Sequence, residues 1–244
     1  MEKVLKWLRG SHNSVRYRFI DHPRQWVEYV LLFRLRGKTW VDFYAHRLDR
    51  PARDTADEPI QEDYLERGRD WFAYIKDHGL QPEHKFLDYG CGVMRIGVPV
   101  INYLDPGNYV GLDISPARLA RGHRLAAENG ISDDRYQTFV VGDCKLLELG
   151  DQRFDFVWAS SVLNHMPDAD ILEMLSAMRG HISSTGQFLF QYNMGEKNHR
   201  IGIKDFVVTG EKMQRWCEQA GFVFENLPSH DGTSYQLVRL TVSS

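Results

Sequence analysis

Residues 86–97 read Phe-Leu-Asp-Tyr-Gly-Cys-Gly-Val-Met-Arg-Ile-Gly, and this stretch decides the fold. A short apolar run with strand character leads into two glycines, Gly90 and Gly92. Glycine at such a turn lets the backbone pass close to a bound ligand. In open parallel sheets, ligands bind beyond the carboxyl ends of the strands. The stretch therefore predicts a first strand and a loop that binds a ligand.

Strands and helices alternate along the rest of the chain. Besides 85–89, strands are expected over 108–114, 137–141, 154–159, 186–192, 222–227 and 235–240, and helices over 115–129, 168–179 and 209–221, with Ser115, Asp168 and Thr209 as the helix starts. The last two strands are joined by seven residues, whereas parallel strands need a crossover of a dozen or more. We therefore predict an α/β fold: a seven-stranded, mostly parallel sheet with helices on both faces and a C-terminal antiparallel hairpin.

Composition excludes several classes of protein. The 244 residues suit one large domain plus an appendage, and a net charge of −3 argues against a basic nucleic-acid binder, so no nucleic-acid partner is expected. Three widely spaced cysteines favour a reducing, cytoplasmic location. The sequence has no apolar run of membrane-spanning length, and its first residues do not resemble a secretory signal.

The first 59 residues differ from the rest. Residues 1–50 carry eleven Lys/Arg against five Asp/Glu. They interleave these charges with apolar and aromatic side chains that include Trp7, Leu8, Tyr17, Phe19, Trp26, Tyr29 and Val30 to Phe33. Residues 50–59 read as a linker or surface loop, and 60–78 as the first helix of the main domain, so we divide the chain into 1–59 and 60–244. The preferred interpretation of 1–59 is a helical lid over the ligand cleft whose arginines (Arg16, Arg18, Arg24, Arg34 and Arg36) face its mouth. Peripheral contact with an anionic membrane, a homodimer contact and stacking on RNA are the alternatives.

Two acidic residues follow the next two strands. Asp113 ends the second strand, where a carboxylate can accept hydrogen bonds from both hydroxyls of a ribose. Asp143 ends the third, within Gly-Asp-Cys, where it could read an adenine edge. Each signal alone is weak, but their order, each at the end of its strand, is specific.

Residues 85–240 resemble a class I S-adenosylmethionine-dependent methyltransferase. Leu87 to Gly92 is similar to the family's first motif, and Asp113 and Asp143 fall where the family has its ribose and adenine contacts. Val93 and Met94 depart from the family, which often has a third small residue there, and Arg95 is a candidate for the methionine carboxylate. The resemblance implies S-adenosylmethionine as cofactor, S-adenosylhomocysteine as product, and cofactor contacts from Asp88, Gly90, Gly92, Arg95, Asp113, Ile114, Asp143, Cys144 and Ser160.

A nicotinamide dinucleotide is the weaker alternative. Its fingerprint requires Gly-x-Gly-x-x-Gly, and Arg95 stands where the third glycine would be.

Residues 160–167, Ser-Ser-Val-Leu-Asn-His-Met-Pro, follow the fourth strand, where the resemblance places the transferred methyl group. They lack the Asn/Asp-Pro-Pro-Tyr motif of enzymes that methylate nucleobases or protein amides. His165 is the candidate general base, because an imidazole suits proton transfer at neutral pH. A histidine that only positions the loop is the alternative, since alignment alone can drive methyl transfer. Asp168 and Asp170 read as helix N-terminal charges, and no metal is expected.

The long connection over 193–208 carries Lys197, His199, Arg200 and Lys204, which would suit an anionic acceptor, although a solvated loop is an equal interpretation. The sequence thus predicts methylation of a small-molecule or glycan acceptor, at oxygen or nitrogen. A catalytically inactive relative that binds a ligand or partner is the alternative.

Overall fold

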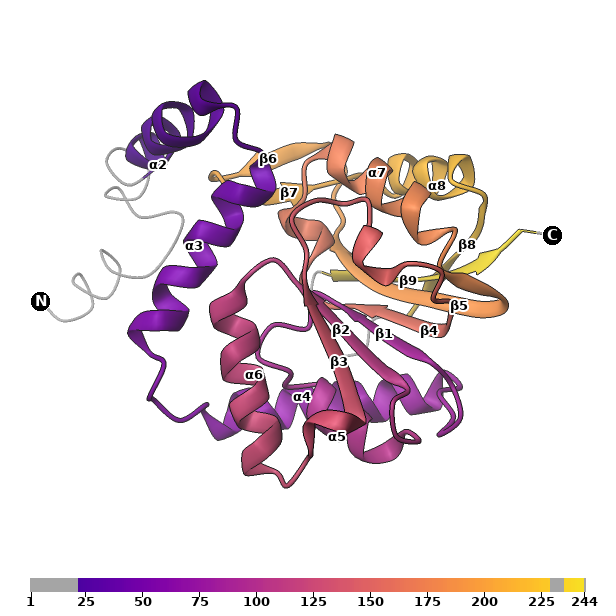
Figure 1. The fold of residues 1–244 in the computed structure, drawn as a ribbon. Helices are drawn as coiled ribbons and strands as arrows, with labels where there is room; N and C mark the ends of the chain where they lie inside the picture. The colour runs from indigo at the N-terminus through magenta and orange to yellow at the C-terminus, as the bar shows by residue number, and fades with distance from the viewer. Residues whose placement is uncertain (1–21, 229–234, 244) are drawn as a thin grey trace, which may run out of the picture.

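The computed structural model describes residues 22–228 and 235–243 (Figure 1). The predictions made for Trp7, Leu8, Arg16, Tyr17, Arg18 and Phe19 lie outside the described residues.

A seven-stranded sheet forms the centre of the molecule. Its strands are β1 Phe86–Tyr89, β2 Tyr109–Asp113, β3 Tyr136–Val140, β4 Phe154–Ala159, β5 Ile182–Asn193, β8 Phe222–Leu227 and β9 Tyr235–Val242. Their order in the sheet is β3-β2-β1-β4-β5-β9-β8. The first five strands pair in parallel, and β9 runs antiparallel to both β5 and β8. The predicted fold class is confirmed, including the antiparallel hairpin.

Helices cover both faces of this sheet. Helices α4 Glu62–Asp77, α5 Gly97–Tyr103 and α6 Pro116–Glu128 pack on one face, and α7 Asp168–Met178 and α8 Gly210–Gln219 on the other. Successive residues of a strand point into the two hydrophobic cores, one on each face of the sheet. Phe86 packs in the core beneath α4–α6, and Leu87 packs in the core beneath α7 and α8. This alternation is the two-residue period of a strand buried on both faces. Helix α5, which the sequence analysis did not predict, begins seven residues after Gly90 and packs on β2.

Three helix starts were predicted, and the helices begin there. The hydroxyls of Ser115 and Thr209 accept hydrogen bonds from the backbone N–H of the third residue of their helices. Asp168 was expected to cap α7, and this is wrong, because Pro167 occupies the N-cap position and no side chain caps the helix. Asp168 is the first helical residue, and its carboxylate forms an ion pair with Lys212 of α8.

The described part of the N-terminal extension is helical. Helix α2 His22–Glu28 continues through a π-helical turn, η2 Tyr29–Phe33, and a 3₁₀ turn, η3 Arg34–Arg36. Helix α3 Trp40–Asp54 then runs from the β6–β7 hairpin down to α6 (Figure 1). It begins with a capping box, in which Thr39 and Asp42 bond each other's backbone N–H groups. The predicted linker over 50–59 is therefore wrong in its first half, because α3 continues to Asp54 with Pro51 inside it. The domain boundary after residue 59 stays a prediction.

The long connection after β5 forms a small hairpin of β6 His199–Ile201 and β7 Asp205–Val207. Short 3₁₀ turns complete the described structure: η4 Asp133–Arg135, η5 Leu147–Leu149 and η6 Leu163–His165. The η6 turn carries the candidate base close to this hairpin.

Candidate functional site

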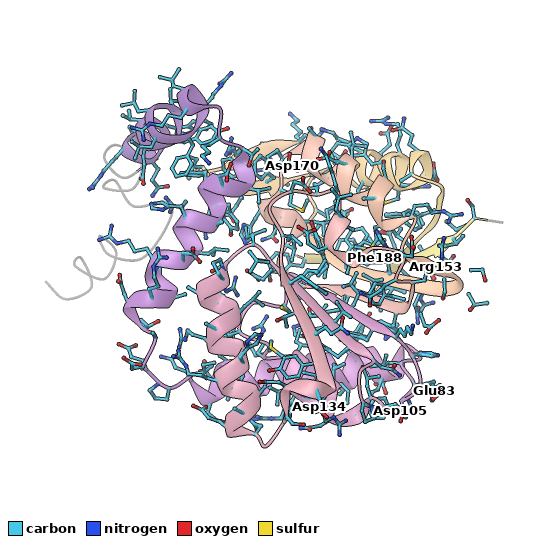
Figure 2. All side chains as sticks on the ribbon, viewed as in Figure 1. Glu83, Asp105, Asp134, Arg153, Asp170 and Phe188 are labelled. Atoms are coloured by element: carbon cyan, nitrogen blue, oxygen red, sulfur yellow. The ribbon has the colours of Figure 1, made fainter. Side chains whose placement is uncertain are left out.

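A cavity of about 400 Å³ lies at the carboxyl ends of the parallel strands. Figure 2 shows Asp170, which lines it, at the end of the molecule opposite Glu83, Asp105 and Asp134. Nine residues predicted for the site line this cavity: Asp88, Gly90, Arg95, Asp113, Ile114, Asp143, Cys144, Ser160 and His165. The tenth, Gly92, does not line it but donates its backbone N–H to Asp113, 2.8 Å away. The fold thus gathers residues from the ends of four strands, β1 to β4, around one space.

The loop after β1 is closely packed around its glycines. Gly90 and Gly92 have φ angles of 84° and 56°, which residues other than glycine rarely adopt. A Cβ atom at Gly90 would lie 2.3 Å from Cγ2 of Val162, and one at Gly92 would lie 2.3 Å from Nη2 of Arg118. Met94 also adopts a left-handed conformation, with φ 57°, and its buried side chain packs against Gly122 of α6. The larger residue at this departure from the family pattern therefore serves the contact with α6.

Asp113 is held by the backbone at both carboxylate oxygens. Oδ2 accepts from Gly92 N–H and Oδ1 from Ser115 N–H, each over 2.8 Å. Burial raises the pKa of this carboxyl, while the Arg118 guanidinium and the two N–H groups oppose the rise. Two bonds leave lone pairs on each oxygen free for hydroxyl donors from the cavity. Asp113 can therefore tie the glycine loop to α6 and still bind a ligand.

Asp88 is buried beneath the same loop. Burial raises the pKa of its carboxyl to about 7, although the hydrogen bond from the Tyr109 hydroxyl, 2.9 Å long, acts in the opposite direction. Nearby Asp113 raises this pKa further, and Arg95 lowers it. A cationic group entering the cavity would favour the ionised form of Asp88.

Two arginines line the cavity beside these carboxylates. The Arg95 guanidinium lies 4.4 Å from the centre of the Tyr64 ring, a cation–π contact with α4. Arg118 was missed by the sequence analysis, although it stands two residues after Pro116 at the start of α6. The Asp113 carboxylate raises the pKa of Arg118 against the opposing influence of burial. Both guanidiniums keep a fixed positive charge at the cavity wall.

The remaining predicted cofactor residues occupy the β2 and β3 ends and the β4 loop. The carboxylate of Asp143 accepts the N–H of Lys145 over 2.8 Å, which fixes the turn after β3. Cys144 is buried, and burial raises the pKa of its thiol to about 12. The hydroxyl of Ser160 accepts a hydrogen bond from Gln191 over 2.6 Å. These side chains and Ile114 form the wall of the cavity at this edge.

His165 has an acidic partner that the sequence analysis did not find. Its Nδ1 lies 2.9 Å from Oδ1 of Asp205 on β7 and 3.2 Å from the carbonyl oxygen of Lys204. Both atoms are hydrogen-bond acceptors, so they favour the tautomer with the proton on Nδ1. The other ring nitrogen, Nε2, lies 3.3 Å from the amide nitrogen of Asn164. Forty residues separate His165 from Asp205, and the pairing depends on the β6–β7 hairpin, for which the sequence has no clear signal.

Helix α3 closes the cavity from the opposite side. Trp40, Val41, Tyr44 and Leu48 line it, and the Tyr44 ring lies 5.1 Å from that of His165. Burial raises the pKa of the Tyr44 phenol above its ordinary value, with a further contribution from Asp205. At its other end, Asp49 accepts hydrogen bonds from the Ser115 hydroxyl, over 2.5 Å, and from the Ala117 N–H, over 3.3 Å. Helix α3 is thus bonded to the start of α6.

The basic residues of the long connection over 193–208 lie in different surroundings. Arg200 lies over the rings of Trp26, Trp40 and Phe206, with its guanidinium carbon 4.5–4.6 Å from each centre. It also donates to the carbonyl oxygen of Ile203, and burial lowers the pKa of its guanidinium. Arg200 therefore joins the hairpin to the N-terminal helices instead of binding an acceptor. Of the others, Lys204 lines the cavity, whereas Lys197 and His199 are exposed.

The geometry of the sheet and cavity defines a Rossmann-like methyltransferase fold, and comparisons with known proteins agree. A family model described as a methyltransferase domain matches residues 86–186. A probable chloroplastic tocopherol O-methyltransferase of Oryza sativa subsp. japonica is 35% identical over 97 residues, which are 40% of this chain and 26% of that protein. Sterol 24-C-methyltransferase erg6 of Aspergillus fumigatus is 33% identical over 92 residues, 38% of this chain and 24% of that protein. The chain spans about a quarter of the length of these curated relatives.

Solved structures share the fold over a longer stretch. Magnesium protoporphyrin IX methyltransferase from Synechocystis PCC 6803, with bound SAM, aligns with a TM-score of 0.65 and 14% identity over 85% of this chain and 99% of that one. The glycopeptide N-methyltransferase MtfA, in complex with S-adenosyl-L-homocysteine, aligns with a TM-score of 0.57 and 18% identity over 72% of this chain and 90% of that one. The matched domain and the shared fold are those of class I S-adenosylmethionine-dependent methyltransferases.

Proposed function

We propose that this protein transfers a methyl group from S-adenosylmethionine to an oxygen or nitrogen of a small-molecule or glycan acceptor. The observation that carries the proposal is the arrangement of two sets of groups around one cavity. The buried carboxylates Asp88 and Asp113 line the cavity with Gly90, and His165, which contacts Asp205, lines it as well. The first set suits the cofactor, and the second suits proton removal from an acceptor.

The residues present fit the cofactor. Gly90 lines the cavity with bare backbone that a ligand can approach, and Asp113 keeps acceptor capacity for ribose hydroxyls. Asp88 and Arg95 provide one negative and one positive group, which suit the ammonium and carboxylate of the methionine part. Asp143 and Cys144 would flank the adenine. When bound, S-adenosylmethionine supplies a methyl group on a sulfonium, which passes to the acceptor as the carbon–sulfur bond breaks.

His165 would remove the proton that the acceptor must lose. With Nδ1 bonded to Asp205, Nε2 carries the lone pair, which the Asn164 amide contacts, and takes the proton of an acceptor hydroxyl or amine as the new bond to carbon forms. The imidazolium that results is stabilised by the Asp205 carboxylate 2.9 Å away. The bond between Nε2 and Asn164 is long, at 3.3 Å, so an acceptor can compete with it. Bulk solvent is the final destination of the proton.

The acceptor side of the cavity favours a compound with an apolar or ring-shaped body. Trp40, Val41, Tyr44 and Leu48 of α3 form its wall, and Lys204 adds a cation. The names of the relatives mention tocopherol and sterol, and that of the solved structure mentions a porphyrin. Such acceptors support the proposal of an acceptor with an extended apolar surface. A cytoplasmic location and a homodimer stay predictions.

The test is a screen of acceptor pools with methyl-labelled S-adenosylmethionine, using wild-type protein, His165→Ala and Asp113→Ala. We expect His165→Ala to slow turnover by about 10²–10⁴-fold with cofactor affinity nearly unchanged. Asp113→Ala should weaken cofactor binding at least tenfold, because charge-assisted hydrogen bonds are worth about 1.5–3 kcal/mol each. Wild-type protein that binds neither cofactor nor product in calorimetry would refute the assignment. Cofactor binding without turnover on any pool, equal in wild type and His165→Ala, would favour an inactive ligand-binding relative.

A further inference from the structure

The helical segment 23–36 is apolar on two faces. One face carries Trp26, Tyr29 and Phe33, which pack against α3 and Arg200. The other carries Val27, Leu31 and Leu35, spaced four residues apart, and they are 55%, 53% and 71% exposed. Leu32 beside them is 45% exposed. Large apolar side chains that gather on an exposed helix face mark a surface that another partner covers, so something else should cover this outer face.

Positive charges surround the outer face. Arg24, Arg34, Arg36 and Lys38 are exposed, and within residues 22–228 and 235–243 none of them has an ion-pair partner. Glu28 is the one acid in residues 23–38, and it lies 4.0 Å from His46. Apolar side chains bordered by unpaired cations are the pattern of a helix that lies in a membrane interface.

We propose that the outer face of residues 23–38 docks on the surface of an anionic lipid bilayer. Leu31 and Leu35 would enter the boundary between headgroups and acyl chains, and the four cations would contact anionic headgroups. Docking in this plane is compatible with the finding that no helix among the described residues is long and apolar enough to cross a membrane.

Charge complementarity favours a lipid bilayer over a second copy of the chain and over residues 1–21. A second copy of the chain would bring the same four cations to the contact. Residues 1–21 carry five Lys/Arg against two Asp/Glu, so they share the charge sign of the face as well. An anionic bilayer complements both the face and the segment that precedes it.

The docked segment is joined to the wall of the cavity. Tyr29 and Phe33 contact Phe43 of α3, with ring centres 5.0 and 5.3 Å apart, and the neighbouring Trp40 and Tyr44 line the cavity. Docking therefore brings the acceptor side of the site to the bilayer. On the proposed function, a lipid-like acceptor could then enter without crossing water.

The test is flotation of full-length protein with vesicles of phosphatidylcholine alone and with 30% phosphatidylglycerol. Neither cofactor nor acceptor is added, so a failure here leaves the methyltransferase assignment untouched. We expect binding to the anionic vesicles and at least tenfold weaker binding to the neutral ones, because each cation near an anionic surface adds about fivefold. Leu31→Glu/Leu35→Glu and Arg34→Glu/Arg36→Glu should each lower binding at least tenfold. Val223→Glu, at an exposed apolar residue of β8, is the matched control and should bind like wild type.

A fluorescent probe distinguishes the occupants. The native cysteines Cys91, Cys144 and Cys217 are buried, so Leu35→Cys can be labelled selectively with an environment-sensitive dye. We expect a blue shift when anionic vesicles are added. Absence of binding by wild type, or equal binding by the leucine variant, would overturn the proposal. A protein that is dimeric in solution and becomes monomeric on Leu31→Glu/Leu35→Glu would assign the face to a second copy. A dye that is already shielded in the monomer without vesicles would assign it to residues 1–21.

Discussion

The indole nitrogen of Trp40 donates a hydrogen bond to the backbone carbonyl of His165 over 2.9 Å. This bond joins the first turn of α3 to the residue proposed as the base. Tyr44, the other aromatic residue of α3 beside this histidine, contacts the imidazole ring and not the backbone carbonyl of His165. The position of the base along the cavity therefore depends on its contact with α3.

Trp40→Phe should lower turnover about three- to tenfold and leave cofactor affinity unchanged. The phenyl ring keeps most of the packing with Arg200 and Phe206, but the His165 carbonyl loses a bond worth about 0.5–1.5 kcal/mol. Steady-state kinetics and calorimetry measure the two quantities. Trp216→Phe on α8, away from the cavity, is the control and should change neither. Equal losses of turnover in both variants would contradict a role for the Trp40 bond.

Asp205→Asn should lower kcat at least tenfold with little change in KM, since Asp205 touches His165 but does not line the cavity. The amide keeps the shape of the carboxylate and removes the charge that stabilises the imidazolium. The double variant Asp205→Asn/His165→Ala should be no slower than His165→Ala alone, because a positioning residue has no effect without its partner. Additive losses in the double variant would show that Asp205 acts independently of the histidine.

Asp88→Asn should change how stability depends on pH. A carboxyl with a pKa near 4 in the unfolded chain and about 7 in the folded one binds more protons when folded between these values. The free energy of unfolding of the wild type should therefore fall, by on the order of a few kcal/mol, as pH rises from about 4 to about 7. Asp88→Asn should lose this contribution and become the more stable protein at pH 8.

Denaturant unfolding at a series of pH values measures this effect. Tyr109→Phe is the informative second variant, because removing the hydroxyl that bonds Asp88 should raise the carboxyl pKa and extend the falling limb to higher pH. Parallel pH curves for wild type and Asp88→Asn would rule out Asp88 as the source.

Asp49→Ala should loosen the lid. Asp49 is largely buried and bonds the start of α6, and hydrogen bonds to a charged group contribute about 1.5–3 kcal/mol. Amide exchange in α3 should accelerate about 10- to 100-fold, with smaller changes in the sheet. Asp54→Ala removes an exposed ion pair with Arg50 in the same helix, and exchange there should stay close to wild type. Similar acceleration in both variants would mean that α3 is not held through Asp49.

Sequence patterns were sufficient for the sheet because each strand is locally marked. The turn at Gly90 requires a positive φ, Ser115 and Thr209 carry their cap hydroxyls, and the short connection before β9 forbids a parallel strand. Each of these signals spans only a few residues, so it can be recognised in the sequence alone. The gathering of Asp88, Asp113 and Asp143 at one edge then follows from parallel strands.

What the sequence could not indicate depends on contacts between distant segments. The partnership of His165 with Asp205 requires a hairpin whose strands are three residues long. Arg200, a plausible anion ligand by charge, is instead occupied by aromatic rings from two parts of the chain. The continuation of α3 through Pro51 was missed, because the proline and the charged residues around it suggested a loop. The packing of α3 on α6 outweighs the low helix propensity of proline.

The place of β9 in the sheet has a consequence for synthesis on the ribosome. β9 pairs with β5 on one side and β8 on the other, so the strand made after both must insert between them. Until it does, β5 presents an open edge to the nascent chain's surroundings, and Leu237, Val238 and Leu240 are missing from the core. The first five strands can pair as they emerge, but β8 has no neighbour in the sheet until β9 arrives. A chain that stalls on the ribosome before residue 235 should therefore form an intermediate with an exposed strand edge and exposed apolar surface, to which chaperones bind. Once β9 has been made and has inserted, chaperone binding should stop.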